Sequence, residues 1–130
     1  MVVDTSAVMA VLLGEPQRHA LESLLLHGPC RISAATRVEV AMVVEGRVGA
    51  EGAQIVDELL DRFDVEVRPV DARMARTAIS GWRRYGKGRH PAGLNFGDCF
   101  SYALAIELNE PLLFVGDDFA RTDVESALGA

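Results

Sequence analysis

The sequence predicts one α/β domain over residues 1–130, built as a mainly parallel central sheet with helices on both faces. Two observations predict this fold class. Short apolar or alternating runs of strand length recur along the chain, and segments with helical spacing of apolar residues separate them. Such alternation favours parallel strands joined by right-handed crossovers. A length of 130 residues with 49% hydrophobic residues also suits one globular domain with its own core.

Glycine and proline set the boundaries of the elements, because they end helices and mark loops. The segment Gly86–Gly97 holds four glycines and one proline and is predicted to be a loop. The predicted strands are Met1–Val3, Cys30–Ser33, Val65–Arg68 and Pro111–Val115, with a further short strand near Val124–Ala127. The predicted helices are Ser6–Leu13, Pro16–His27, Ala35–Val48, Ala50–Phe63, a helix that follows Pro69–Asp71 and reaches Tyr85, and Asp98–Leu108.

Composition argues against a membrane or secreted protein. The longest apolar run, Ala7–Leu13, is far below the roughly 18 residues that indicate a membrane span. No basic segment precedes an apolar stretch of the signal-peptide type. Cys30 and Cys99 lack the spacing of a metal site or a disulfide framework, so we expect two buried thiols in a reducing, cytoplasmic environment.

The charge distribution separates one basic span from an otherwise acidic chain of net charge −6. From Ala72 to Gly97 there is no Asp or Glu, and the span carries a local charge of +6. Such a span can hold the phosphates of a polyanion, although a solvated helix face and loop would give the same pattern. Its basic residues are Arg73, Arg76, Arg83, Arg84, Lys87 and Arg89.

Acidic residues from four distant segments are predicted to meet at one edge of the sheet. Asp4 ends the first strand, and Glu39 lies in the first turns of the helix after the second strand. Asp98 begins the helix that runs antiparallel to the last strand, and Asp117 follows that strand. The carboxyl ends of parallel strands share one edge, where α/β proteins bind their ligands.

Each of these acids also has an ordinary structural explanation. Asp4 can cap the helix that follows it, and Glu39 has the spacing of a capping box with Thr36. Asp98 can form the same kind of box with Asn95 or favour the helix dipole. Asp117 and its neighbour Asp118 suit a turn.

The cost of crowding carboxylates favours a cation. Two carboxylates about 5 Å apart repel by roughly 3 kcal/mol at an effective dielectric near 20. Hard oxygen ligands without a Cys or His cluster indicate Mg²⁺, with Mn²⁺ as an alternative, rather than zinc. Such ions activate water and hold phosphate oxygens, which is the chemistry of metal-assisted phosphodiester cleavage.

The same segments resemble PIN-domain ribonucleases, specifically VapC-family toxins of type II toxin–antitoxin systems. The resemblance covers essentially the whole chain in order. The segments that carry it are Met1–Ala7 (MVVDTSA), Ser33–Glu39 (SAATRVE), Tyr85–Ala105 (YGKGRHPAGLNFGDCFSYALA), Pro111–Phe119 (PLLFVGDDF) and Thr122–Asp123.

This resemblance implies a three-layer PIN-like fold, divalent-metal endoribonuclease activity, a VapB-type antitoxin that blocks the site, and homodimers. It assigns Asp4, Glu39 and Asp98 to the metal site. Gly116 stands where many relatives have a polar residue, which leaves Asp117 or Asp118 as the fourth acid, and Asp117 is closer to the strand end. The resemblance also implies that Thr5 and Ser6 orient the metal shell. The acid-free basic span separately predicts that the RNA backbone lies on Arg83, Arg84, Lys87 and Arg89.

Other functions fit the residues less well. An Asp-nucleophile phosphatase would need a second Asp at the position of Ser6, and a receiver module would need a lysine near the last strand. A PIN-like module that binds RNA without cutting it remains an alternative. Cys99 is expected to be a packed side chain. Trp82 and Tyr85 can lie in the core or stack on a base, and the core is favoured for Trp82. His90 lies in the basic loop and could contact phosphate, whereas His19 and His27 are given no role.

Overall fold

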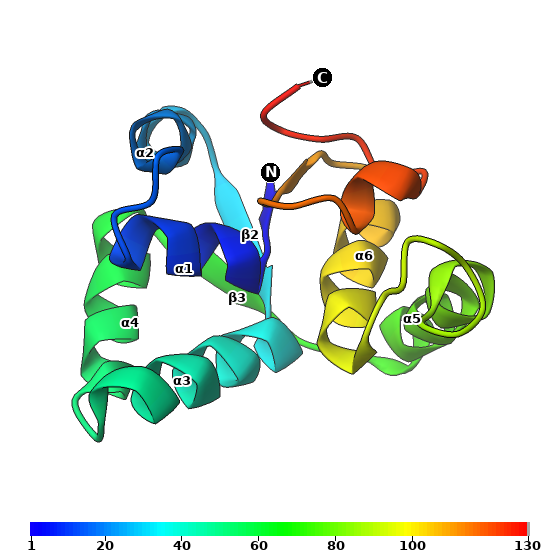
Figure 1. Ribbon diagram of the computed structural model, residues 1–130, viewed down its shortest axis with the longest axis horizontal. Helices are drawn as coiled ribbons and strands as arrows, with labels where there is room; N and C mark the ends of the chain where they lie inside the picture. The colour runs from blue at the N-terminus through cyan, green and yellow to red at the C-terminus, as the bar shows by residue number, and fades with distance from the viewer. Residues whose placement is uncertain (130) are drawn as a thin grey trace.

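The computed structural model describes residues 1–129, in which an all-parallel sheet of four strands is surrounded by helices (Figure 1). The strand order is β3-β2-β1-β4. The chain adds β2 and then β3 on one side of β1, and β4 pairs with the other side of β1. The strands are β1 (Val2–Val3), β2 (Cys30–Ser33), β3 (Val65–Arg68) and β4 (Leu112–Leu113). The helices are α1 (Thr5–Leu12), α2 (Arg18–His27), α3 (Ala34–Val48), α4 (Gly52–Arg62), α5 (Ala72–Tyr85), α6 (Phe96–Leu108) and the 3₁₀ turn η1 (Phe119–Arg121).

Helices cover both faces of the sheet, as the sequence predicts. Helices α1 to α4 lie on one side and α5 and α6 on the other (Figure 1). Alternation along the strands explains the two buried clusters, because successive side chains point to opposite faces. Val3 and Leu113 pack with α1 to α4, whereas Val2 and Leu112 pack with α5, α6 and η1. The three-layer α/β prediction is therefore confirmed.

Several bounds differ from the predicted ones by one or two residues, and one predicted strand does not form. Residues 124–127 do not form a strand; a single parallel bridge joins Ser126 to Leu112. Helix α6 begins at Phe96, two residues early, because the Asn95 side chain accepts a hydrogen bond from the Asp98 backbone and caps the helix there. None of the helices within residues 1–129 is long and apolar enough to cross a bilayer.

The prediction that Trp82 is a core residue is wrong. The buried stripe of α5 runs through Met74, Ala78, Gly81 and Tyr85, and Trp82 lies one position off that stripe with 42% of its surface exposed. The two cysteines are free and buried, as expected.

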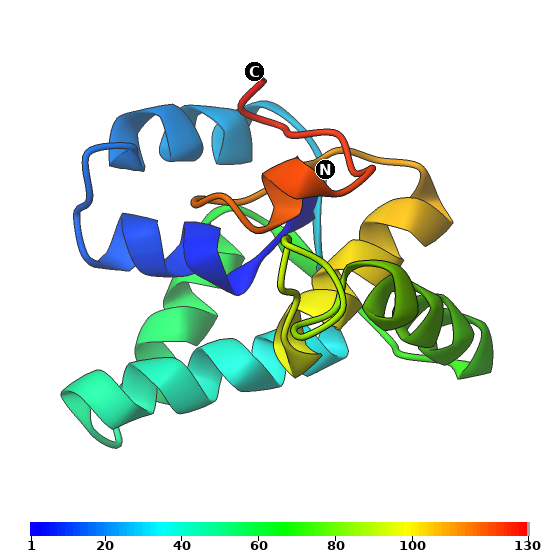
Figure 2. The ribbon, with the colours of Figure 1, turned by 45° about the vertical axis from the view of Figure 1, so that its right-hand side comes forward.

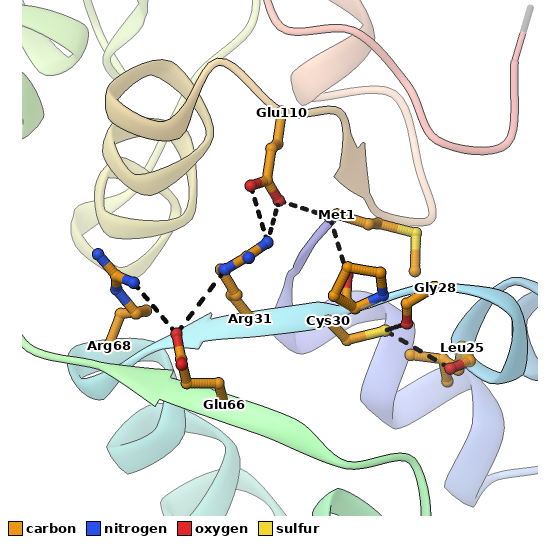
Figure 3. Close-up of polar contacts among 9 residues, drawn as sticks. Met1, Leu25, Gly28, Cys30, Arg31, Glu66, Arg68 and Glu110 are labelled. Atoms are coloured by element: carbon orange, nitrogen blue, oxygen red, sulfur yellow. Dashed lines mark hydrogen bonds and ion pairs between the residues drawn. The ribbon is translucent and has the colours of Figure 1, made fainter.

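An ion-pair network holds the sheet at its amino edge (Figure 3). Glu110 lies just before β4, and its Oε1 accepts from the Met1 amino group at 2.6 Å. Both of its carboxylate oxygens also accept from Nη1 of Arg31 at 2.8 Å. Arg31 also lies 3.7 Å from Glu66 of β3, which pairs with Arg68. Burial alone would raise the pKa of Glu110, but the Met1 amino group and Arg31 outweigh it and lower that pKa. The network thus connects all four strands.

Replacing Glu110 should destabilise the fold more than replacing an exposed acid. Glu110→Gln leaves two cations, Arg31 and the Met1 amino group, facing each other without the carboxylate between them. We expect a loss of about 1 kcal/mol in the free energy of unfolding, after a discount for solvent screening. Urea denaturation measures it, with Asp57→Asn in the Arg37–Asp57 pair as the control, because the Asp57 side chain is 64% exposed. Equal stability of the two variants would contradict the role given to this network.

Candidate active site

Asp4 is a buried carboxylate at the carboxyl end of β1. It is the N-cap of α1, and one of its oxygens accepts from the Ser6 backbone at 3.0 Å and from the Ser6 hydroxyl at 2.7 Å. Its other oxygen accepts from the Ser101 hydroxyl of α6 at 2.6 Å. Only 3% of the residue is exposed. The capping explanation of Asp4 is therefore correct, but a cap alone does not require a second hydroxyl from a helix 97 positions away.

The hydroxyls around Asp4 extend the contact to two further elements. The Ser6 oxygen also accepts from the Val115 backbone at 3.0 Å, just after β4. Ser101 lies 3.2 Å from the Thr36 hydroxyl of α3. Sequence reasoning missed Ser101 and Thr36. The available signal was a polar residue inside an apolar helix, one turn after Asp98 and on the same face of that helix.

Glu39 is held beside Asp4 by the neighbouring residue Thr5. The Thr5 hydroxyl donates to Glu39 Oε1 at 2.5 Å. The capping box with Thr36 does not form, because α3 begins one turn earlier with Ser33 as its N-cap. A Cβ on Gly97 would lie 1.9 Å from Glu39 Oε2, so the absence of a side chain at Gly97 makes room for this carboxylate. Glu39 thus lies against the first turn of α6, next to Asp98.

Asp98 combines a capping role with a place among the acids. Its carboxylate accepts from the Asn95 backbone at 3.0 Å, which completes the capping box. Burial, followed by the charges of Asp4, Asp118 and Glu39, raises the pKa of Asp98 to about 7, and the hydrogen bond from Asn95 offsets only part of this effect. Burial and the neighbouring carboxylates therefore raise the pKa of Asp98 by more than the capping hydrogen bond lowers it.

The ends of three helices bring these acids together. The N-termini of α1, α3 and α6 converge beside the carboxyl ends of the strands in both views (Figures 1 and 2). Asp117 and Asp118 are exposed in the turn after β4, and Asp118 is the one whose charge contributes to the shift at Asp98. Asp118 precedes η1 without forming a side-chain cap. The choice of Asp117 stays a prediction, and the electrostatics favour Asp118.

The carboxylate oxygens of the site are ligands that suit a hard cation. In this structure they instead accept hydrogen bonds from hydroxyl groups of the protein. The charged groups that act on Asp98 are the carboxylates of Asp4, Asp118 and Glu39. Within residues 1–129, no group of three or more His, Cys, Asp or Glu side chains is arranged so that it could hold a metal ion as it stands. Asp4 faces Ser6 and Ser101, and Glu39 faces Thr5. A cation at this site would therefore need these side chains to rotate toward a common point.

The predicted RNA-binding residues lie on the last turn of α5 and the loop after it. Arg84 lies 3.5 Å from Asp123 and stacks on Tyr85, and Arg89 lies 4.1 Å above the Trp82 ring. Within the described residues, Arg83 and Lys87 form no ion pair, so their charges are not neutralised by a neighbouring acid. The loop leads directly into the capping box of Asp98.

Comparison with known proteins identifies the family. The PIN-domain family model matches residues 1–125. A "Ribonuclease VapC" of Mycolicibacterium smegmatis is 50% identical over 95% of this chain and 97% of its own length. This chain belongs to the VapC family of PIN-domain ribonucleases. "Ribonuclease VapC42" of Mycobacterium tuberculosis is 46% identical, with 98% of each chain covered.

Two solved structures share the fold at low identity. The chain matches Mycobacterium tuberculosis VapC20, described as a sarcin–ricin loop cleaving toxin, with a TM-score of 0.74 and 20% identity over 95% of both chains. It matches a toxin–antitoxin complex from Klebsiella pneumoniae with a TM-score of 0.72 and 18% identity over 98% of this chain and 96% of the other. The expected PIN-like architecture is therefore confirmed.

Neutralising Asp98 should stabilise the protein in EDTA. The folded chain holds the Asp98 proton more tightly than the unfolded chain does, because the pKa is raised from 3.8 to about 7. The stability that this carboxyl contributes is thus present at low pH and is lost as the pH rises through about 7. We expect Asp98→Asn to raise Tm by several degrees at pH 8, on the order of 2 kcal/mol after solvent screening, and by less at pH 5.

Thermal unfolding of the parent and two variants in EDTA measures this effect. Asp71→Asn is the matched control, because Asp71 caps α5 through the Met74 backbone and is not among the charges that act on Asp98. If Asp98 acts only as a favourable first-turn charge, its loss should instead lower stability by about 0.3–1 kcal/mol. A lower Tm for Asp98→Asn at pH 8 would therefore refute the acidic-cluster interpretation.

Proposed function

We propose that this chain is a Mg²⁺-dependent endoribonuclease that hydrolyses RNA phosphodiester bonds and serves as the toxin of a VapBC-type toxin–antitoxin pair. The observation that carries the proposal is the contact chain among three acids from three elements: Asp4 with Ser101 of α6, Glu39 with Thr5 beside Asp4, and Glu39 with Gly97 beside Asp98. Membership of the VapC ribonucleases supports RNA as the substrate.

Asp4, Glu39 and Asp98 would hold the cation, with Asp118 or Asp117 as the fourth acid. When bound, Mg²⁺, or Mn²⁺ in its place, would activate a water molecule and neutralise phosphate charge. The Asp4 carboxylate accepts from two hydroxyls, which would fix its position toward the cation. Asp98, with a pKa near 7, must lose a proton for full charge, so cation binding should release protons near neutral pH.

The thiol of Cys99 is not required as a nucleophile in this mechanism. Its Sγ donates to the Asn95 carbonyl at 3.2 Å, and burial, followed by the charge of Asp98, raises its pKa. A thiol held neutral in this way is a poor nucleophile. Hydrolysis would then rely on water, as the acidic donor set indicates.

The antitoxin belongs to this proposal as the second partner. The structural match to a Klebsiella pneumoniae toxin–antitoxin complex supports an antitoxin for this chain as well. We propose that a VapB-type protein covers the acidic site and that the toxin forms a homodimer, as the family resemblance implies.

The first functional prediction is that cleavage requires both the metal and Asp98. Total RNA incubated with Mg²⁺ should be cut by the parent chain and left intact with excess EDTA. Asp98→Asn should lower the rate by at least about 100-fold, since it removes a ligand, whereas the capping control Asp71→Asn should retain the rate. Cleavage at the parent rate in excess EDTA would exclude the metal mechanism.

The second functional prediction uses Gly97 to move Glu39 without altering an acid. In Gly97→Ala the new methyl group would displace the Glu39 carboxylate, whose flexible side chain can shift without unfolding the protein. We expect weaker Mg²⁺ binding by calorimetry and at least about tenfold slower cleavage, in line with the loss of one well-placed ligand.

Gly46→Ala is the matched control for that variant. Gly46 also lies inside a helix, and a Cβ there meets nothing within 4 Å. Both variants gain helix propensity, by about 1 kcal/mol each. Unchanged Mg²⁺ affinity and rate in Gly97→Ala would show that the position of Glu39 does not matter for the reaction.

The third functional prediction concerns the basic residues beside the site. The double variant Arg83→Ala/Lys87→Ala should bind single-stranded RNA more weakly, and its slope of log affinity against log salt should fall by about 1.4, or about 0.7 for each lost phosphate contact. The variant Arg18→Ala/Arg47→Ala removes the same charge from α2 and α3 and should keep the parent slope. Identical slopes for all three proteins would leave the basic span as a solvated surface.

A further inference from the structure

A groove between α5 and α6 opens beside the acidic site and is not used by the proposed cleavage chemistry. Its volume is about 510 Å³, within the range of small-molecule sites. The walls are mostly apolar and include Ile79 and Trp82 of α5 and Phe96 and Phe100 of α6. Lys87 is the one charged side chain among the residues that line it.

Two aromatic side chains of this groove are largely exposed, and each has a ring contact with a neighbouring side chain. Phe96 is 82% exposed in the first turn of α6, and its ring lies edge to face with Phe100 at 5.0 Å. Trp82 is 42% exposed, and the Arg89 guanidinium lies 4.1 Å from its ring. Exposed apolar area costs about 25 cal/mol per Å², so packing within the domain does not explain Phe96 at this position. The geometry suits a flat apolar ligand.

The groove and the acidic site share one structural unit. Asn95 lines the groove, and its side chain accepts from the Asp98 backbone at 2.8 Å. The Asp98 carboxylate in turn accepts from the Asn95 backbone at 3.0 Å. Phe96 and Phe100 share one face of α6, and Asp98, two positions from each, lies on a different face of the same turns. A group held in the groove therefore lies within about one helical turn of Asp98, and Asn95 connects the two faces.

The charge around the groove identifies an anionic, ring-bearing ligand. No Asp or Glu occurs from Ala72 to Gly97, the span that supplies α5 and the loop, and Lys87 and Arg89 lie at the groove. Nucleotides combine a flat ring with a phosphate, and stacking of one base on an aromatic side chain contributes about 1–3 kcal/mol.

We propose that this groove binds an unpaired nucleobase of the RNA strand, next to the phosphodiester that is cut. The base stacks on Phe96 and Trp82, Lys87 contacts the backbone phosphate, and the strand then passes to the acids. The inference rests on the proposed ribonuclease function and adds to it the part of the substrate that positions the cleavage site. It makes Phe96 and Trp82 substrate-binding residues.

Trp82 fluorescence tests the proposal directly, because Trp82 is the one tryptophan of the chain. The full chain carrying Asp98→Asn is titrated with a single-stranded RNA octamer of mixed sequence, whose integrity is checked on a gel. A second titration uses an octamer with the same backbone and abasic sites. We expect saturable quenching by the RNA and at least tenfold weaker binding of the abasic strand, since stacking needs the bases. Equal affinity for the two strands would overturn the proposal.

Phe96→Ala supplies the variant arm. It should weaken binding of the octamer by about 5- to 150-fold, the range that corresponds to the loss of one stacked base, and should leave the weak binding of the abasic strand unchanged. Met42→Ala removes a similarly exposed apolar side chain from α3, 70% exposed, and should bind like the parent. Parent-like binding by Phe96→Ala would overturn the proposal.

Two further measurements separate this inference from its alternatives. Mg²⁺-dependent cleavage of total RNA by the unmodified chain is measured separately. Absence of cleavage would contradict the proposed function. Parent-like RNA binding by Phe96→Ala would contradict only the role given to the groove. Sedimentation without RNA tests a second copy of the chain as the occupant. If Phe96→Ala converts a dimer to a monomer and RNA does not quench Trp82, the groove is a protein interface and the inference is wrong.

Discussion

The buried carboxylate of Asp4 is the contact on which the arrangement of the site depends. Through Ser6 it reaches the backbone after β4, and through Ser101 and then Thr36 it reaches α6 and α3. A buried carboxylate is costly unless hydrogen bonds satisfy it, so the hydroxyls that surround it fix the helices on both faces of the sheet. The layer of α1 to α4 and the layer of α5 and α6 meet at this residue.

The same constraint explains why the neighbouring acids are tolerated. Asp98 is stabilised by its capping box, Glu39 by Thr5, and Asp4 by two serines. These local hydrogen bonds offset part of the repulsion, but the pKa of Asp98 remains raised to about 7. The fold therefore keeps one carboxyl in an unfavourable state that only a proton or a cation relieves. Such perturbed groups concentrate at functional sites.

Hydrophobic patterning and turn residues were enough to predict most of the fold from sequence. The strands Cys30–Ser33 and Val65–Arg68 have the predicted bounds, because apolar or alternating runs there are closed by strong breakers. Tertiary contacts decided the rest. Residues 124–127 form one bridge instead of a strand. Trp82 is exposed because its angular position on α5, rather than its hydrophobicity, decides its burial.

The candidate site divides in the same way. Strand ends and helix starts predict that Asp4, Glu39 and Asp98 share one edge, since topology alone brings them there. The roles of Ser101, Thr36 and Gly97 were not predicted. They depend on contacts between α1, α3 and α6, and the hydrophobic pattern of the sequence does not show which residues of different helices meet.

The capping alternatives proved compatible with the site for Asp4 and Asp98. A carboxylate near a helix N-terminus is stabilised by about 0.3–1 kcal/mol, and the backbone N–H groups fix its position. Helices α1 and α6 can therefore hold Asp4 and Asp98 close together at a reduced cost, while the Thr5 hydroxyl holds Glu39. For Asp4 and Asp98, capping is thus part of how this fold assembles the acidic cluster, rather than a competing explanation of the same residues.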